Sequence, residues 1–105
     1  MKPVLLRPAA HDDLEQLVRE HVATGGPGFG VDALRMAVDA LSSIEAAPDA
    51  GARLLGRLCE IPGLQTRRTR HLPLLWLYFE ADDRVDVVRL LSERQDVPRL
   101  MHWAG

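Results

Sequence analysis

The sequence predicts an α+β domain in which a helical hairpin packs on one face of a small antiparallel sheet. Apolar residues recur at helical spacing in two consecutive segments, near residues 8–23 and 30–46. Segments with the residue types of strands then follow one another between residues 64 and 91. Two helices in direct succession exclude a simple alternation of strands and helices, which favours the hairpin-on-sheet arrangement. The expected order is strand, helix, helix, three strands and a short terminal helix.

The N-terminal half is expected to contain an edge strand and the two helices. Residues 3–7 are a short apolar run, and proline is tolerated at the start of such a strand. Pro8 suits the first position of a helix that should end at glycines 25–26. The glycine-rich stretch 25–30 is interpreted as the connector of the hairpin, because a phosphate-binding loop would follow a strand and carry GKS or GKT. The second helix should end before Pro48.

The C-terminal half is expected to contain three strands. Residues 64–72 have the residue types of an exposed strand, and the nearly continuous apolar run 74–80 is typical of a central strand. Residues 81–84 read as a turn, so the strand 85–91 should pair antiparallel with 74–80. The segment 52–65 contains leucines and arginines, but its pattern does not separate a short helix from a loop.

The predicted core follows from the apolar faces of these elements. Because alternate residues of a strand face opposite sides, Trp76 and Tyr78 share a face, and both are interpreted as packing residues. Val85, Val87 and Leu91 are likewise expected on one common face. Val97, Leu100 and Met101 are expected to form the apolar side of the terminal helix. The residues expected to be buried are Leu14, Leu17, Val18, Leu34, Val38, Leu41, Leu75, Leu77, Val85 and Val87.

Length and composition favour one globular domain over residues 1–105. Hydrophobic residues make up 47% of the chain and charged residues 27%, as in globular rather than disordered proteins. The single cysteine, Cys59, excludes an internal disulfide and a cysteine-rich zinc site, and no metal or cofactor is expected. No signal peptide is expected, and no apolar run approaches the roughly 20 residues of a membrane helix. The expected location is the cytoplasm.

Positive charge is concentrated in the middle of a net-acidic chain. Residues 51–79 carry five arginines against Glu60, or +4, whereas the whole chain carries −2. Arg67, Arg68 and Arg70 could form a nucleic-acid patch, but an edge strand kept from aggregating by charge explains them as well. The net negative charge argues mildly against general nucleic-acid binding.

Four consecutive motifs in residues 73–98 carry a family resemblance. LWLYFE, ADD, VDVVRLL and SERQDVP follow one another in this order. They are similar to a strand with a tyrosine, an acidic turn, a strand with an internal arginine, and a charged knuckle ending in Arg-x-Asp or Arg-Gln-Asp. The chain thus resembles the ParE branch of the RelE/ParE superfamily of bacterial toxins. PAAHDDLEQL also resembles the family's first helix, and the resemblance is loosest in residues 52–72.

The resemblance implies both a function and partners. It implies the toxin of a type II toxin–antitoxin system that inhibits DNA gyrase by binding and is neutralised by a cognate antitoxin, so a hetero-oligomer with that antitoxin is expected. The alternative is a RelE-type endoribonuclease that cuts messenger RNA on the ribosome. An edge strand and a two-helix face would offer the antitoxin both β-addition and helix-in-groove docking.

The charged knuckle 92–96 favours a binding surface over catalysis. Cutting RNA without a metal requires a base, an acid and positive charge. Ser92 stands where many relatives have histidine, and Tyr78, the only tyrosine, lies on the earlier strand. His71 and His102 are not at positions that the resemblance marks, so no catalytic residue is assigned. The residues expected to contact the target are Arg89, Arg94, Asp96, Leu100, Met101 and Trp103.

These proposed contacts have structural alternatives. Arg89 is expected to pair with a nearby acid more readily than to contact a ligand. Arg94 and Asp96 could bond each other and fix the turn into the last helix. Trp103 is expected either to pack onto the sheet or to remain as an interface anchor.

Overall fold

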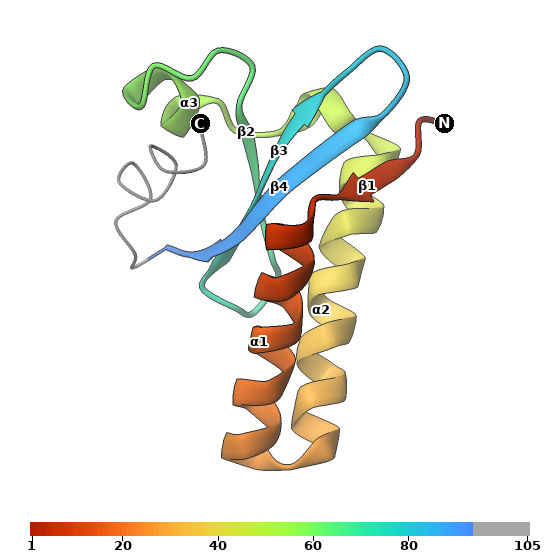
Figure 1. Cartoon of the computed structure of the whole chain (residues 1–105), viewed down its shortest axis with the longest axis vertical. Coiled ribbons are helices and arrows are strands. Elements are labelled where there is room, and N and C mark those ends of the chain that lie inside the picture. The colour runs from red at the N-terminus through yellow and green to blue at the C-terminus, as the bar shows by residue number, and fades with distance from the viewer. Residues whose placement is uncertain (94–105) are drawn as a thin grey trace.

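The computed structural model, which describes residues 1–93, confirms a helical hairpin packed on one face of a sheet (Figure 1). The predicted terminal helix lies outside the described residues, as do Arg94, Asp96, Leu100, Met101, His102 and Trp103. The elements are β1 (Val4–Leu6), α1 (Pro8–Gly25), α2 (Pro27–Ala46), the 3-10 turn η1 (Pro48–Ala50), α3 (Leu54–Leu58), β2 (Gln65–Arg68), β3 (Leu74–Glu80) and β4 (Val85–Ser92).

The sheet is mixed rather than entirely antiparallel. Its four strands lie in the order β1-β4-β3-β2. β2 and β4 both pair antiparallel with β3, as predicted, whereas β1 pairs parallel with β4, with Val4 opposite Val85. The prediction was wrong for β1 because a strand of three residues carries no pattern that specifies its direction. The C-terminal strand β4 is therefore central, and the N-terminal strand β1 lies at one edge.

A single residue, Gly26, connects the two long helices. Its φ of 88° favours glycine, and its N–H donates to the carbonyl of Val22 at 2.8 Å, which ends α1. Pro27 then opens α2, so the predicted connector 25–30 is much shorter in the structure. Gly30 lies within α2 at the point where the helices cross, and a Cβ there would collide with the side chain of Val22. The sharp turn and this close contact together define the hairpin.

The buried stripe of α2 consists mainly of alanine. Ala33, Ala37, Ala40 and Ile44 face the core, whereas Leu34 and Val38 are 39% and 43% exposed. The prediction that Leu34 and Val38 are buried was therefore wrong. Small side chains let α1 and the sheet approach α2 closely, and this leaves the larger apolar ridge of the helix outside. The other predicted core residues are buried (Leu17, Leu77, Val85, Val87) or partly buried (Leu14, Val18, Leu41, Leu75).

The sheet has an apolar cluster on each face. Trp76 and Tyr78 belong to the cluster under the hairpin, and Leu77 to the cluster on the opposite face, as strand alternation predicts. The pairing of β3 with β4 shifts between Leu77 and Tyr78, which leaves Val88 as an extra residue in β4. This β-bulge reverses the alternation beyond Val87, so Leu91 joins the opposite cluster rather than the face of Val87.

The segment 52–65 covers the second face of the sheet. It contains the short helix α3, and Leu55 and Ile61 pack against the cluster formed by Leu64, Leu77, Val88 and Leu91. The protein is thus layered as hairpin, sheet and a short covering segment (Figure 1). Neither long helix, nor any other helix in residues 1–93, combines the length and apolar character needed to cross a membrane.

Candidate functional site

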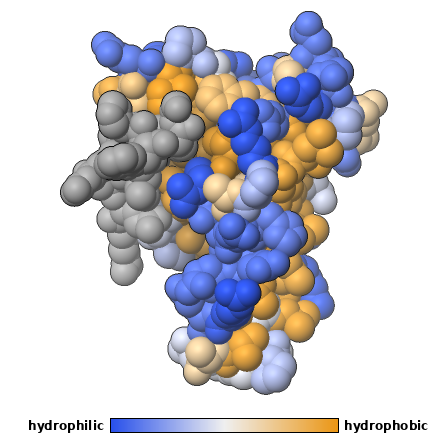
Figure 2. Space-filling model, in the orientation of Figure 1, coloured by the Kyte–Doolittle hydropathy of each residue, from blue (hydrophilic) through white to orange (hydrophobic). Residues whose placement is uncertain are grey.

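An apolar groove runs between the edge strand β1 and the helix α2. Val4 and Leu6 form one wall, Val38 and Leu41 form the other, and the groove has a volume of about 150 Å³. The exposed stripe of α2 continues the apolar surface through Leu34 and Val31 toward the tip of the hairpin. Figure 2 shows apolar side chains gathered along the α2 side of the hairpin, beside the hydrophilic surface of α1. We call the four wall residues and this stripe the α2 groove.

The outer edge of β1 borders the α2 groove. On its inner side, the carbonyl of Pro3 accepts from Val85 N–H at 2.9 Å, and the N–H of Arg7 donates to the carbonyl of Val87 at 2.9 Å. Backbone groups alternate in direction along a strand, so those of Val4 and Leu6 point away from β4. No strand of residues 1–93 lies beyond β1. An added strand therefore finds free backbone groups directly beside an apolar groove.

Arg89 joins the sheet to the hairpin. Its Nε donates to Asp13 Oδ2 at 2.7 Å and its Nη2 to Asp13 Oδ1 at 3.0 Å, and the N–H of Leu90 donates to the same carboxylate at 2.9 Å. The side chains of Arg89 and Asp13 are 23% and 18% exposed. The hydrogen bonds that Arg89 donates to Asp13 raise the pKa of Arg89, so the guanidinium keeps its charge. The predicted pairing of Arg89 with an acid is confirmed.

The three arginines of the predicted basic patch have different environments. Arg67 reaches the C-terminal end of α2, where it donates to the hydroxyl of Ser43 and, at 2.8 Å, to the carbonyl of Ala47. Arg68 pairs with Glu93 at 2.9 Å, and Arg70 is exposed. Arg67 therefore satisfies the end of a helix, a common role for a basic side chain. The possible nucleic-acid patch reduces to Arg68 and Arg70.

Tyr78 is fully buried, and its hydroxyl is held by neighbours. The Oη donates to the carbonyl of Pro48 at 3.0 Å and accepts from Arg67 Nη2 at 3.3 Å. Burial raises the pKa of Tyr78, and the charge of Arg67 opposes that rise without cancelling it. A buried neutral phenol that donates to one neighbour and accepts from another anchors the turn η1 and is poorly placed to exchange protons with a substrate. The prediction that Trp76 and Tyr78 pack in the core is confirmed.

Replacing Tyr78 with phenylalanine should make unfolding less sensitive to alkaline pH. Because the folded-state pKa is raised, the stabilisation that depends on the neutral phenol is fully present below the ordinary tyrosine pKa of about 10 and is lost as pH rises through the folded value. Denaturant unfolding near neutral pH and about one pH unit above 10 measures the loss in each protein. Tyrosinate absorbance reports on this residue alone, since Tyr78 is the only tyrosine. Equal alkaline losses in the two proteins would contradict the assignment.

His71 and Ser92, which were also considered for RNA cleavage, lie near one end of the sheet. His71 is exposed in the turn before β3 and has a φ of 64°. Ser92 is half-buried at the end of β4, opposite Leu74. Neither Tyr78 nor Arg89 is available beside them, because the phenol bonds the carbonyl of Pro48 and the guanidinium bonds Asp13. Within residues 1–93, this region offers anchoring contacts rather than an assembled acid–base pair.

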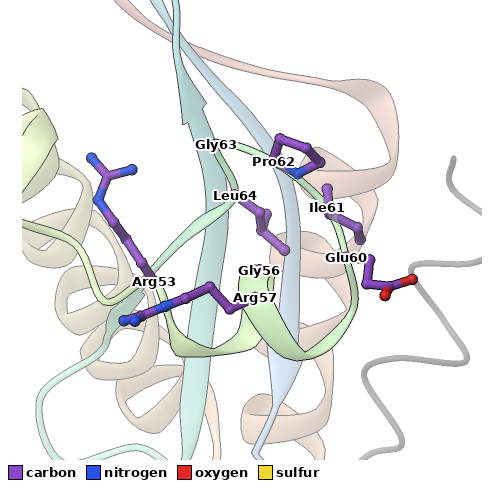
Figure 3. Close-up of a pocket in the computed structure, with 8 residues that line it drawn as sticks. All are labelled: Arg53, Gly56, Arg57, Glu60, Ile61, Pro62, Gly63 and Leu64. Atoms are coloured by element: carbon purple, nitrogen blue, oxygen red, sulfur yellow. The ribbon is translucent and has the colours of Figure 1, made fainter.

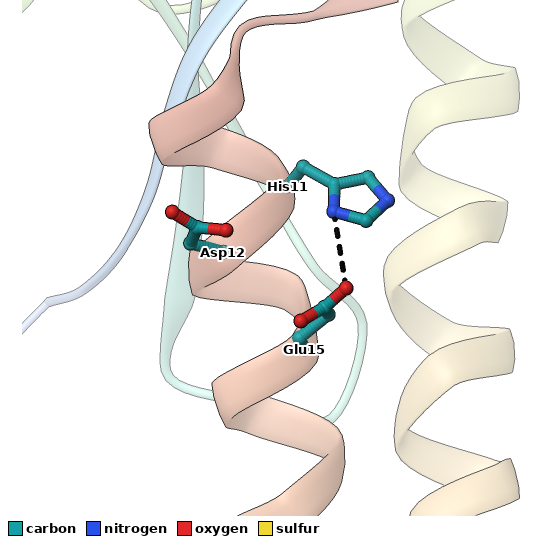
Figure 4. A group of neighbouring side chains, drawn as sticks. All are labelled: His11, Asp12 and Glu15. Atoms are coloured by element: carbon teal, nitrogen blue, oxygen red, sulfur yellow. Dashed lines mark ion pairs between the residues drawn. The ribbon is translucent and has the colours of Figure 1, made fainter.

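One group of possible metal ligands occurs in the described residues, on the first turns of α1 (Figure 4). His11, Asp12 and Glu15 each offer a ligand atom, and these atoms lie within 4.8 Å of one another. All three side chains are exposed, and Glu15 is already paired with His11 at 3.3 Å and with Arg19 at 3.3 Å. Such a solvated helix surface needs no ion to explain it, and no metal is assigned.

Comparison with known proteins adds a structural likeness. No family model matches the sequence, and no curated protein matches it. Among solved structures, the chain is similar to a chain of the chromosomal ParDE TA system from P. aeruginosa, with 19% sequence identity and a TM-score of 0.74. The likeness covers 88% of this chain and 96% of that chain. The chain has a ParE-like fold. The fold that the four motifs imply is thus confirmed over most of the chain.

The ParE-like fold brings together residues that the sequence did not connect. Asp13 and Arg89 are 76 positions apart, and no local pattern links them. The α2 groove was missed because Leu34 and Val38 were assigned to the core. A usable signal was present, since Ala33, Ala37 and Ala40 also recur at helical spacing and mark a second candidate face.

Proposed function

We propose that the chain is the toxin of a type II toxin–antitoxin system, that it inhibits DNA gyrase by binding in the bacterial cytoplasm, and that a cognate antitoxin neutralises it by occupying the α2 groove. The observation that carries the antitoxin contact is the open edge of β1 beside exposed apolar residues of α2. An exposed row of this kind, bordering free strand groups, is typical of a partner surface. The ParE-like fold supports the same assignment.

The groove suits a partner that combines a strand with an apolar helix. Val31, Leu34 and Val38 are spaced three and four residues apart, so they form one continuous ridge on α2. Burying such side chains stabilises a complex by roughly 25 cal/mol per Å² of apolar surface before the cost of ordering is subtracted. Three residues of β1 allow only a short added strand, so most of the affinity would come from the ridge.

Binding rather than chemistry is supported by the state of two polar side chains of β3 and β4. Arg89 is held by Asp13 and Tyr78 by η1, so these side chains stabilise the fold. We retain, as proposed target contacts, Arg89, Arg94, Asp96, Leu100, Met101 and Trp103. Arg89 would act on the target chiefly through its bonds to Asp13, which hold the C-terminal part of β4 in position against α1. Deleting residues 97–105 should then abolish toxicity and leave antitoxin binding largely intact, because the α2 groove is formed by residues of β1 and α2.

A charge placed in the α2 groove should separate antitoxin binding from toxicity. Val38→Glu puts a carboxylate into the apolar wall, so we expect antitoxin affinity to fall by at least about tenfold, or roughly 1.4 kcal/mol, in a binding titration. Arg35→Glu is the control on the same helix, since Arg35 is exposed and does not line the groove between β1 and α2. Cells that express Val38→Glu should stay poisoned even when the antitoxin is present. Unchanged neutralisation of Val38→Glu would move the antitoxin site away from α2.

The target is tested by two assays on the same purified protein. Gyrase supercoiling should be inhibited, and ribosome-bound messenger RNA should remain intact. The double change His71→Ala and His102→Ala should leave gyrase inhibition nearly unchanged. A ribonuclease that relied on either histidine would lose about 10²–10⁴-fold in rate. Cleavage of messenger RNA that this double change abolishes would establish the RelE-type activity instead.

A further inference from the structure

A second groove lies on the covering segment, away from the α2 groove. It is formed by α3 and the turn that follows, has a volume of about 710 Å³, and is walled by Ile61, Pro62 and Leu64 on its apolar side (Figure 3). Arg53 and Arg57 line the other side, one helical turn apart. Figure 3 shows both arginines extending toward the same side of the segment, with Glu60 directed to the opposite side. We call this surface the α3 groove.

The α3 groove is built on a tightly bonded frame. The N–H of Ile61 donates to the carbonyl of Gly56 at 2.8 Å, and the N–H of Cys59 donates to the carbonyl of Leu55 at 2.9 Å. A Cβ at Gly56 would lie 2.7 Å from the carbonyl oxygen of Leu64, so only glycine lets α3 and the turn come this close. The inward residue Leu55 anchors the segment to the sheet. The groove is therefore preorganised, which lowers the entropic cost of binding a partner.

The two arginines of the α3 groove stand out among those of the described chain. Of the ten arginines in residues 1–93, seven pair with a carboxylate or donate to another side chain or carbonyl. Within the same residues, Arg53, Arg57 and Arg70 make no such contact. Two of these three guanidinium groups therefore line one groove, in the part of the chain that carries +4. A guanidinium offers several fixed donors, which match a carboxylate well.

Exposed leucines flank the same arginines. Leu54 and Leu58 are 62% and 71% exposed, and they form a ridge on α3 next to that of Arg53 and Arg57. Large apolar side chains this exposed, beside unpaired cations, are typical of a surface that a partner covers. The pattern is complementary to a helix with carboxylates on one face and apolar residues on the next.

We propose that the α3 groove is a docking site for an acidic amphipathic helix of a second protein partner, distinct from the antitoxin at the α2 groove. Carboxylates of that helix pair with Arg53 and Arg57, and its apolar side chains contact Leu54, Leu58 and the wall at Ile61. The two grooves lie on different faces of the protein, so both can be occupied at once (Figure 1). The site does not depend on which target the toxin assignment names.

A protein fits the α3 groove better than a nucleic acid does. Phosphate-tracking surfaces need several cations along a path, and they gain little from exposed leucines. Here only two arginines line the groove, and the exposed Leu54 and Leu58 lie beside them. The net charge of −2 for the whole chain points the same way.

The test uses the full chain and a designed amphipathic peptide with glutamate and leucine on adjacent faces. We expect amide chemical-shift changes confined to residues 53–64 and an affinity that falls as salt is added. The double change Arg53→Glu and Arg57→Glu should weaken binding by about tenfold or more, since it converts two attractive pairs into repulsive ones. Arg19→Glu with Arg35→Glu is the matched control, because it makes the same charge change at exposed positions of the hairpin.

Each other outcome contradicts the proposal. Equal weakening by the two double variants would show nonspecific charge attraction. Tighter binding of a duplex DNA oligonucleotide than of the peptide, with the same dependence on Arg53 and Arg57, would make the surface a nucleic-acid site. Absence of peptide binding, or shift changes outside the α3 groove, would remove the docking site. If the glutamate variant fails to fold, the double change Arg53→Gln and Arg57→Gln tests the role of the two arginines instead. The amide chemical-shift changes in the unaltered protein still show whether the peptide binds at the α3 groove. Gyrase and growth assays play no part, so failure here leaves the toxin proposal untouched.

Discussion

Replacing Trp76 with alanine is expected to lower the free energy of unfolding by about 3–5 kcal/mol. Trp76 is fully buried between the sheet and the hairpin, and its Nε1 donates to the carbonyl of Ala37 at 3.0 Å. The buried alanines of α2 (Ala33, Ala37 and Ala40) are too small to fill the space that the indole leaves. For a domain stable by about 5–15 kcal/mol, a loss of this size is a large share of the total free energy of unfolding. Denaturant unfolding followed by circular dichroism gives the value.

Two controls bear on the loss at Trp76. Trp76→Phe keeps an aromatic ring but removes both the N–H contact with Ala37 and part of the indole volume, so it should cost less than Trp76→Ala. Leu54→Ala removes a side chain that is 62% exposed and should change stability by no more than about 0.5 kcal/mol. A cost below about 1 kcal/mol for Trp76→Ala would mean that the hairpin does not pack on the sheet as described.

Removing the guanidinium of Arg89 is expected to cost about 1–3 kcal/mol of stability. Arg89→Ala deletes both bonds to Asp13 and leaves that carboxylate, 18% exposed, with only the N–H of Leu90. The estimate is kept below the value for a fully buried pair, because water reaches both side chains. Arg89→Lys keeps the charge but cannot form the two-pronged contact, so it should recover part of the loss. Thermal or denaturant unfolding of each variant provides the comparison.

A double-mutant cycle with Asp13→Ala shows which role of Arg89 dominates. We expect a coupling energy of about 0.5–3 kcal/mol, as for residues in direct contact. Toxicity then gives the second measurement. If toxicity follows stability through the cycle, Arg89 acts by holding β4 against α1. If the double variant is stable but has lost the proposed inhibition of gyrase, Arg89 contacts the target itself. A coupling energy near zero would contradict the ion pair.

The strands β3 and β4 were predictable because their residue types directly indicate that they are buried. Residues 74–80 form β3 as expected, and the predicted strand 85–91 extends by one residue to Ser92. Both strands are covered on their two faces, so most of their positions are apolar. The bulge at Val88 was not predictable, since one extra residue in β4 changes the facing of Leu90 and Leu91 without changing their character.

The helices were predictable in position but not in orientation. α2 carries one ridge of alanines and another of leucine and valine, and both follow helical spacing. Periodicity cannot choose between them, because the choice depends on how closely α1 and the sheet approach. The same limit applies to the candidate site. The strand motif with an internal arginine pointed to Arg89, but its partner Asp13 comes from α1, and only the folded chain brings the two together.

The central position of β4 has a consequence for how the protein forms during synthesis. The hairpin α1–α2 depends on contacts close in sequence and can assemble early, whereas β1 must wait for Val85 and Val87 before it has a neighbour. Contacts of such long sequence separation slow folding. At roughly 5–20 residues per second, about 2–8 seconds pass between the synthesis of Ala46, at the end of α2, and that of Val85, at the start of β4. Until then the chain exposes its sheet-facing apolar surface, so a partner that meets the nascent chain encounters the hairpin first and the completed sheet last.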